Sequence, residues 1–229
     1  MSIDSTAIEI HEDLVIRIDG GHPVTTDTLA ALGSVCDAAE DHGGPGLVLV
    51  HVSGAPDGTW PRDTDVALVS KWERALRRLE RLSLTTVAVV TGECGGPALD
   101  ALLATDYRIA SPSVRLLMTS DTGATWPGMA LYRMVRQAGV AWVRRAALFG
   151  ITIDADEALK AHLIDQLADK PVAALSATPG LLTMLARPDL AVRRQLLLDA
   201  ASVSFEEALG AHLAACDREI RRSSAEAVS

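Results

Sequence analysis

Two kinds of apolar pattern alternate along the first three quarters of the chain. Residues 87–90 are a short continuous apolar run and residues 47–52 are apolar except for His51, whereas residues 14–18 follow an alternating pattern. Continuous runs of this length are typical of strands that are covered on both faces. Between them, residues 25–40 and 66–82 carry apolar side chains at helical spacing, which predicts two amphipathic helices. Strands that alternate with helices favour an α/β core with a largely parallel sheet.

The strand pattern ends before residue 171, and only helical patterns follow it. Residues 181–186, 190–201 and 205–222 each have helical spacing, and Ser204 with Glu207 forms a capping-box pattern before the last of them. Two more helices are predicted earlier, at residues 129–137 and 140–149, and Asp154 with Glu157 marks a further short one. We therefore expect an α/β core over residues 8–170 and a helical C-terminal region over residues 171–229.

The most informative stretch is residues 87–110, VAVVTGECGGPALDALLATDYRIA. A β-branched run leads into Gly92, Gly95 and Gly96, which permit a sharp turn, and Pro97 suits the first turn of a helix. A strand that leads through such a turn into a helix offers free backbone N–H groups to an anion or oxyanion. A plain strand-to-helix connection is the alternative interpretation.

Composition and charge narrow the classes of function. A formal net charge of -9 argues against binding to nucleic acid or to an anionic membrane surface. No apolar run approaches the roughly 20 residues of a membrane span, and the polar start is no signal peptide, so we expect a cytoplasmic protein. Three cysteines and six histidines without ligand spacing indicate neither a disulfide framework nor a metal or redox cofactor.

One helix carries a row of basic side chains. Opposite its apolar positions, the helix at residues 66–82 has a face of five charges: Lys71, Arg74, Arg77, Arg78 and Arg81. A solvated helix face explains these charges, and contact of some of them with phosphate groups is the alternative.

Taken together, these segments resemble the crotonase (enoyl-CoA hydratase/isomerase) superfamily. The resemblance is carried by VAVVTGECGGPALDALLATDYRIAS, by Trp126-Pro127-Gly128, and by ITIDADEALKAHLIDQLAD at residues 151–169. It implies a crotonase-like ββα spiral core, a helical C-terminal region used for trimerisation, and an acyl-CoA site. In that site two backbone N–H groups bind the thioester oxygen, and one or two carboxylates move protons.

Position by position, the chain departs from the family's pattern. The glycine that normally donates one N–H to the thioester oxygen falls on Pro97, which has no N–H. The two catalytic glutamates of hydratases fall on Asp100 and Ser120, with Asp121 one residue later. Asp100, Asp121 and Ser120 are therefore the candidate catalytic residues, and a solvated or capping role is the alternative for Asp100.

The resemblance implies acyl-CoA contacts at two places, the glycine turn and the loop after the second strand. The loop that normally supplies the other N–H corresponds loosely to residues 59–62 and lacks the family's small residues. The candidate contacts are Gly95, Gly96, Trp60 and Arg62.

This combination resembles the DpgB-type helpers of glycopeptide antibiotic biosynthesis, which serve a type III polyketide synthase. The resemblance implies that the protein promotes dehydration and aromatisation of a malonyl-CoA-derived polyketide to 3,5-dihydroxyphenylacetyl-CoA. Its expected partners are an acyl-CoA thioester, the synthase, and copies of itself in a trimer-based homo-oligomer, or the synthase in a hetero-complex.

Two other functions stay open from the sequence. In the first, the fold is a non-catalytic scaffold that activates the synthase by direct binding. In the second, Gly92-Glu93-Cys94-Gly95-Gly96 is a cysteine form of the nucleophile elbow, and the protein is a hydrolase. The hydrolase would draw its acid and base from Asp154 and from His162 or His212, whereas a buried structural thiol is the alternative for Cys94.

Overall fold

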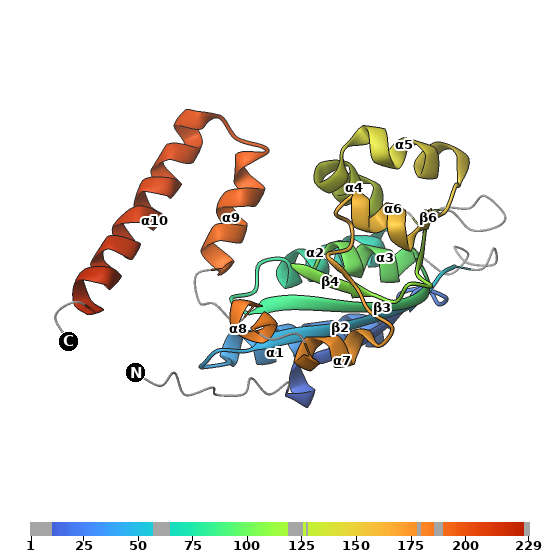
Figure 1. Ribbon diagram of the computed structural model, residues 1–229, viewed down its shortest axis with the longest axis horizontal. Coiled ribbons are helices and arrows are strands. Elements are labelled where there is room, and N and C mark those ends of the chain that lie inside the picture. The colour runs from blue at the N-terminus through green and yellow to red at the C-terminus, as the bar shows by residue number, and fades with distance from the viewer. Residues whose placement is uncertain are drawn as a thin grey trace. The chain divides into compact units, whose positions relative to one another are not determined.

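Strand β3 (Thr85–Gly95) is the centre of the sheet. The computed structural model describes residues 11–56, 65–118, 126, 128–177, 180–185 and 190–226. The chain divides into two units, Met1–Arg187 and Pro188–Ser229. The sheet lies in the first unit, and several of its strands are labelled in Figure 1.

The sheet is parallel along its main path and has one antiparallel edge. The order β1-β2-β3-β4-β7 is formed by β1 (Val15–Asp19), β2 (Leu47–Gly54), β3, β4 (Tyr107–Ala110) and β7 (Gln166–Leu167). The last three residues of β3 pair with β5 (Arg115–Leu117), and β6 (Ile153–Asp154) pairs antiparallel with β5. The mixed α/β fold expected from the sequence is confirmed.

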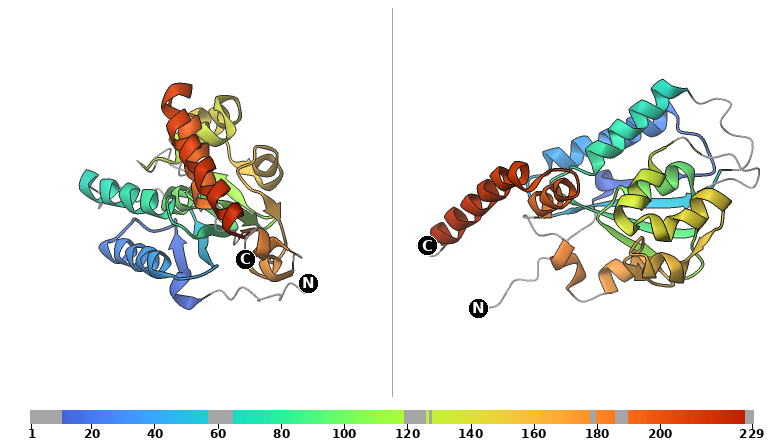
Figure 2. Two further views of the ribbon diagram at one scale, coloured as in Figure 1. Left: turned by 90° about the vertical axis from the view of Figure 1, so that its left-hand side faces the viewer. Right: turned by 90° about the horizontal axis from the view of Figure 1, so that it is seen from above.

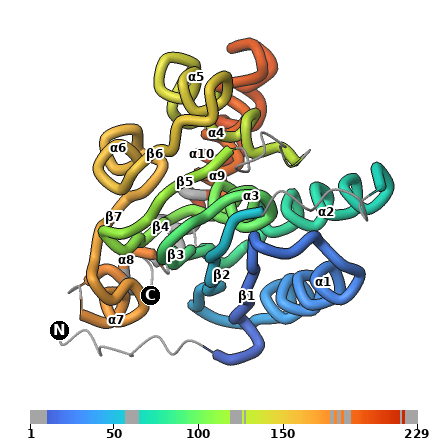
Figure 3. Tube along the Cα trace, turned by 90° about the vertical axis from the view of Figure 1, so that its right-hand side faces the viewer, coloured from blue at the N-terminus to red at the C-terminus, as the bar shows by residue number. Residues whose placement is uncertain are grey.

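Helices cover both faces of the sheet, as Figure 3 shows. Alternate strand residues, Val48 and Val50 among them, pack with α1 (Thr26–Asp41), α2 (Val66–Leu79) and α3 (Gly96–Leu103). Their neighbours, Leu47 and Leu49 among them, pack with α7 (Pro171–Ala177) and α8 (Leu181–Leu185). The continuous apolar runs are thus explained by burial on two sides, as predicted.

Helices α1 and α2 lie side by side (Figure 2). Each has the N-cap that its sequence predicts or allows, since Thr25 accepts the N–H of Thr28 and Asp65 accepts that of Leu68. The indole of Trp72 on α2 is fully buried.

Arg108 on β4 fixes the end of α3. Its guanidinium is buried and donates to the carbonyl oxygens of Leu102, Leu103 and Thr105, at 2.9–3.1 Å. It also donates to the side chain of Gln137 and to the carbonyl of Leu163. One buried charge therefore adds hydrogen bonds to the carbonyls at the C-terminus of α3, and it ties α3 to its neighbours.

Helices α4 (Ala130–Ala138), α5 (Val140–Phe149) and α6 (Ala155–Lys160) follow in the order predicted from the sequence. The short 3-10 helix η1 (Glu12–Leu14) was not predicted. Gly139, at φ +83°, separates α4 from α5. The capping box at α6 is confirmed, because Asp154 accepts the N–H of Glu157 at 2.8 Å and Glu157 accepts that of Asp154 at 3.4 Å.

Three features differ from the sequence-based expectation. Strand β3 continues to Gly95, beyond the apolar run at 87–90, because its last residues pair with β5. Helix α2 ends at Leu79, before residue 82. The pattern gave no sign of α7 or of the two-residue strands β6 and β7.

Within its described residues, the second unit contains two helices, α9 (Leu190–Ala200) and α10 (Phe205–Glu226). The predicted capping box at its second helix is confirmed, because Ser204 accepts the N–H of Glu207 and Glu207 accepts that of Ser204. Among the described side chains of α9 none is buried, and Leu197, Phe205 and Ile220 are 65–74% exposed. The division at residue 170 and the oligomerisation role of the region after it stay predictions.

Across the described part of the chain, every helix is too short or too polar to span a lipid bilayer.

Candidate active site

The carboxyl ends of β1, β2 and β3 meet in a crowded corner of backbone. Gly20 follows β1 and donates its N–H to the carbonyl of Ser53 at 2.7 Å. A Cβ on Gly20 would collide with the carbonyl oxygens of Gly54 and Gly95. Glycine at position 20 therefore allows three parallel strands to end against one another, at the edge where α/β sheets commonly place their sites.

The turn into α3 begins at this corner. Gly95 is the N-cap of α3 in an extended conformation, and Gly96 is its first residue at φ +53°, a left-handed conformation that favours glycine. Both glycines are buried. Pro97 lies in the first turn as predicted, so the helix N-terminus lacks an N–H at that position. The backbone thus offers one donor fewer than the family's glycine run would.

Asp100 lies one helical turn after Gly96, so the two share a face of α3. Its side chain is completely buried. Oδ2 accepts a hydrogen bond from the indole N–H of Trp72 at 3.3 Å and a second, short one from the indole N–H of Trp126. The interpretation of Asp100 as a solvated or capping residue is therefore wrong, because its carboxyl is enclosed between α2 and the segment before α4.

The other oxygen of Asp100 faces an arginine that is already engaged. Oδ1 lies 3.8 Å from Nη1 of Arg133 and has no hydrogen-bond partner among the described residues. The same Nη1 lies 2.9 Å from Glu73, and Nε of Arg133 donates to Glu80 at 2.7 Å. Glu80 in turn pairs with Arg77 at 2.7 Å. Three carboxyl groups therefore surround one buried guanidinium.

Glu73 also fixes the start of α4. Its second oxygen accepts the backbone N–H of Met129, the N-cap residue of α4, at 2.8 Å. A carboxylate at a helix N-terminus is favourable because the unpaired N–H groups there carry partial positive charge. Glu73 thus links α2, α4 and the arginine beside Asp100.

The surroundings of Asp100 change its acidity. Burial raises its pKa most, and the charge of Glu73 raises it further. Arg133 and the two indole N–H groups lower it, and the balance raises the pKa of Asp100 to about 7. For Arg133 the negative charges of Glu80 and Glu73 outweigh the effect of burial and raise its pKa, so it stays a cation.

Gly128 closes the site over Asp100. A Cβ at this position would collide with Oδ2 of Asp100 and with the indole of Trp126. The glycine of the Trp126-Pro127-Gly128 motif is therefore required by the close approach of the carboxyl group.

The structure describes three of the seven predicted site residues. It brings together Asp100, Gly95 and Gly96 on β3 and α3. Trp60, Arg62, Ser120 and Asp121 lie outside the described residues.

Of the residues that surround Asp100, the sequence singled out only Trp126 and Gly128, as members of a family motif and without a role for either. The structure adds Trp72, Glu73, Trp126 and Arg133 to the site. The sequence contained one indication of a role for Arg133. This cation occurs between Ala130 and Met134 on the buried side of a helix, where arginine is rarely found unless it is paired.

Cys94 does not have the surroundings of a nucleophile. Its thiol is fully buried in the core, and burial raises its pKa well above the ordinary value. Asp154, the proposed acid of that site, caps α6 instead. The cysteine-hydrolase interpretation is contradicted, because a reactive thiol must be accessible and largely ionised. The interpretation of Cys94 as a structural thiol is confirmed.

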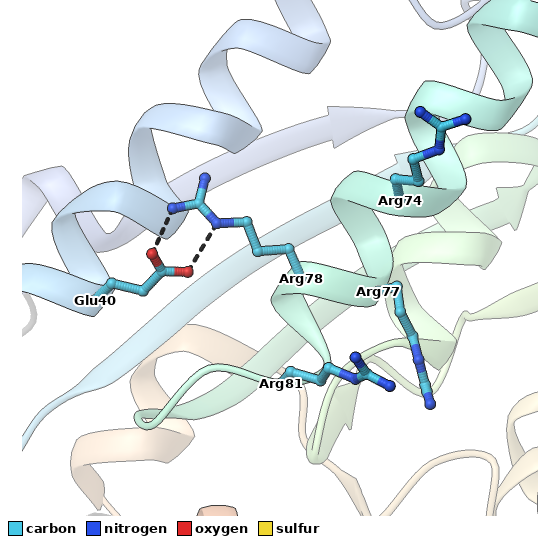
Figure 4. Close-up of a pocket in the computed structure, with 5 residues that line it drawn as sticks. All are labelled: Glu40, Arg74, Arg77, Arg78 and Arg81. Atoms are coloured by element: carbon cyan, nitrogen blue, oxygen red, sulfur yellow. Dashed lines mark hydrogen bonds and ion pairs between the residues drawn. The ribbon is translucent and has the colours of Figure 1, made fainter.

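The arginine face of α2 forms a shallow cavity of about 340 Å³, lined by Glu40, Arg74, Arg77, Arg78 and Arg81. In Figure 4 Arg78 reaches Glu40 on α1, whereas Arg74 points away from that pair. Arg78 bonds Glu40 at 2.6 and 2.7 Å and Asp37 at 2.6 Å. These ion pairs favour a solvated, internally paired helix face, and contact with phosphate stays a prediction.

Among the residues that the structure describes, no group of three or more His, Cys, Asp and Glu side chains is placed to hold a metal ion.

Comparison with known proteins places this geometry in context. The sequence model of the enoyl-CoA hydratase/isomerase family matches residues 61–213. A protein of Amycolatopsis orientalis described as an enoyl-CoA hydratase is 47% identical over 210 residues, covering 92% of this chain and 97% of that protein.

Solved structures show the same fold at low identity. An enoyl-CoA hydratase of Shewanella pealeana superposes with a TM-score of 0.73 at 17% identity, covering 93% of this chain and 86% of that one. An enoyl-CoA hydratase/isomerase of Marinobacter aquaeolei gives 0.72 at 19% identity, over 90% and 87% of the two chains.

Proposed function

The chain belongs to the enoyl-CoA hydratase/isomerase family, and from that premise we propose that it acts on an acyl-CoA thioester as an auxiliary of a type III polyketide synthase. Its role is to promote dehydration and aromatisation of a malonyl-CoA-derived polyketide to 3,5-dihydroxyphenylacetyl-CoA in glycopeptide antibiotic biosynthesis. The family membership supports the acyl-CoA ligand, and the altered residues around α3 support a reaction other than simple hydration.

The state of Asp100 carries this proposal. Oδ2 is held by two indole N–H groups, while Oδ1 has no hydrogen-bond partner within the described chain. A carboxyl group whose pKa is about 7 exchanges its proton near neutral pH, which is what general acid–base catalysis requires. One such group suffices for a dehydration that gains aromatic stabilisation.

Pro97 also supports a reaction other than simple hydration. Hydration of an isolated enoyl thioester depends on two N–H donors at the carbonyl oxygen, and a proline in the first turn of α3 supplies none. We therefore expect crotonyl-CoA to be hydrated about 100-fold or more slower than by family members that keep both donors. Rapid conversion of crotonyl-CoA by the purified protein would contradict the proposal.

The catalytic role is tested in a reconstituted synthase reaction. Asp100→Asn keeps the volume of the side chain and an acceptor for the indole N–H groups, but it cannot donate an acidic proton. We expect the yield of dihydroxyphenylacetyl-CoA to fall by about 100-fold or more. Asp156→Asn, at an exposed carboxylate in the first turn of α6, is the matched control and should leave the yield unchanged.

The non-catalytic scaffold is a second candidate, and one observation favours it. Asp100 has no exposed surface, so a substrate reaches it only after a side chain moves. As a scaffold, the protein would still stimulate the synthase, and elute with it, when Asp100→Asn and Asp121→Asn are combined. Full stimulation by the double variant would replace the catalytic proposal with this one.

The oligomeric state belongs to the same proposal. Apolar side chains of the second unit, such as Leu213 and Ile220, are 59% and 65% exposed, which supports an interface with further chains. Light scattering on the protein alone and with the synthase separates a trimer-based homo-oligomer from a hetero-complex.

A further inference from the structure

The three carboxyl groups around Arg133 do not share its charge equally. Glu80 and Glu73 lie 2.7 and 2.9 Å from its nitrogens, whereas Asp100 lies 3.8 Å away. Each glutamate has a further partner that holds it in place, since Glu80 pairs with Arg77 and Glu73 accepts the N–H of Met129. The two glutamates are thus fixed at close range, and Asp100 is left at the longest distance.

We propose that Glu73 and Glu80 take up the charge of Arg133, so that Asp100 rests as a neutral carboxylic acid and is the proton donor of the site. Glu73 and Arg133 are then positioning residues, which act on the substrate only through Asp100. That Asp100 gives its proton to a substrate rests on the proposed function. The protonation state of Asp100 in the free protein is argued from the geometry alone.

A count of charges supports the neutral acid. Arg77 and Arg133 contribute two positive charges, and Glu73 and Glu80 contribute two negative ones. The cluster is neutral when Asp100 carries its proton and negative when Asp100 is ionised. Because Asp100 is completely buried, an uncompensated charge there is strongly unfavourable.

The other groups that face Asp100 carry no charge. The indoles of Trp72 and Trp126 donate neutral hydrogen bonds to Oδ2. On the sheet side the nearby thiol of Cys94 stays protonated, since burial raises its pKa. Within the described residues, the balance between Glu73 and Arg133 therefore decides whether Asp100 is charged.

A neutral acid fits the first step of a dehydration. The proton of Asp100 passes to the hydroxyl group of the substrate, the C–O bond breaks, and water leaves. The neighbouring carbon then gives up a proton to the Asp100 carboxylate, which restores the acid. The net change is loss of one water molecule, with no oxidant or metal needed.

The two indoles offer a direct measurement of this protonation state. Their N–H resonances shift when the carboxyl that accepts them loses its proton, and a ¹H–¹⁵N spectrum resolves the four tryptophans of the chain. We expect the signals of Trp72 and Trp126 to titrate together with a midpoint near pH 7. Trp142, which is 49% exposed on α5, is an internal reference that should not follow them.

Variants at Glu73 separate the proposal from a merely structural role. Glu73→Gln removes a negative charge and frees Arg133 for Asp100, so the midpoint should move down by about one pH unit. Glu73→Asp keeps the charge and should leave the midpoint close to that of the wild type. Glu40→Gln, the same substitution at the ion pair with Arg78, is the matched control and should not move it.

Each outcome decides between the two proposals. A midpoint below pH 5, or one that Glu73→Gln leaves unchanged or raises, overturns the charge assignment. If the midpoint moves as expected while Asp100→Asn keeps full product yield, the charge assignment stands and the catalytic role fails. If Asp100→Asn abolishes the product yield while Glu73→Gln does not move the midpoint, the catalytic role stands and the charge assignment fails.

Discussion

Replacing Asp100 by asparagine should stabilise the protein at pH 8 and should have little effect near pH 4. The pKa of Asp100 rises from an ordinary 3.8 to about 7 on folding. The folded state therefore holds this proton more tightly than the unfolded state does. Stability is lost as the pH rises from about 4 to about 7, and the loss persists at higher pH. Asparagine is neutral throughout and escapes this loss.

The size of the effect follows from the shift in pKa. The pKa of Asp100 differs by roughly 3 units between the folded and unfolded states. This difference corresponds to about 4 kcal/mol of stability at pH 8, since each pKa unit is worth about 1.4 kcal/mol. The amide oxygen of asparagine still accepts the indole N–H groups of Trp72 and Trp126, but as a neutral acceptor it binds them more weakly. The stronger bonds to the ionised carboxylate are already part of its shifted pKa, so the full gain of about 4 kcal/mol is expected.

Urea unfolding followed by tryptophan fluorescence measures this gain. All four tryptophans precede Arg187, so their fluorescence reports on the first unit alone. The difference in free energy of unfolding between Asp100→Asn and wild type should grow from about 1 kcal/mol at pH 4.5 to its full value at pH 8, while Asp156→Asn shows no such trend. A difference that is the same at both pH values would refute the reasoning.

Three shorter predictions concern the frame around the site. Lysine at position 108 has three donors for five acceptors, so Arg108→Lys should lower the free energy of unfolding by about 3 kcal/mol, whereas Arg115→Lys on the surface should change it little in the same urea titration. Gly96→Ala places a side chain at φ +53° and should cost about 1–2 kcal/mol by thermal unfolding; an unchanged midpoint would contradict the left-handed turn. Iodoacetamide should modify the exposed Cys216 in the native protein, and mass spectrometry should find Cys94 modified only in urea.

The sequence predicted the elements that local patterns specify. The strand at 87–90 follows from its continuous apolar run, and the helix at 66–82 follows from apolar periodicity. The caps at Asp154 and Ser204 follow from side chains that bond their own backbone. The extension of β3 to Gly95 depends on pairing with β5, which no local pattern encodes. The same is true of the two-residue strands β6 and β7, whose pairing partners are remote in sequence.

The site was predictable only in part, for a related reason. The resemblance pointed to Asp100, and Pro97 was visible at once as a residue without an N–H. Periodicity along α2 marks Trp72 as a core residue, but it does not reveal that the indole N–H meets a carboxyl group 28 residues later. Glu73 and Arg133 belong to different helices, and only the packing of α4 against α2 joins them.

The loss of a backbone donor and the presence of a buried acid are consistent with one another. Removal of one donor from a thioester oxygen raises a barrier by about 3 kcal/mol, which makes hydration of an unactivated alkene slow. A dehydration that ends in an aromatic ring has a lower barrier to begin with, so it tolerates Pro97 while still requiring a proton for the leaving hydroxyl. In the proposed reaction, a neutral Asp100 that is held by two indoles and kept uncharged by Glu73 would supply that proton without a second carboxyl at position 120. Restoring glycine at position 97 should therefore raise any residual hydration of crotonyl-CoA more than it raises the yield of the synthase reaction.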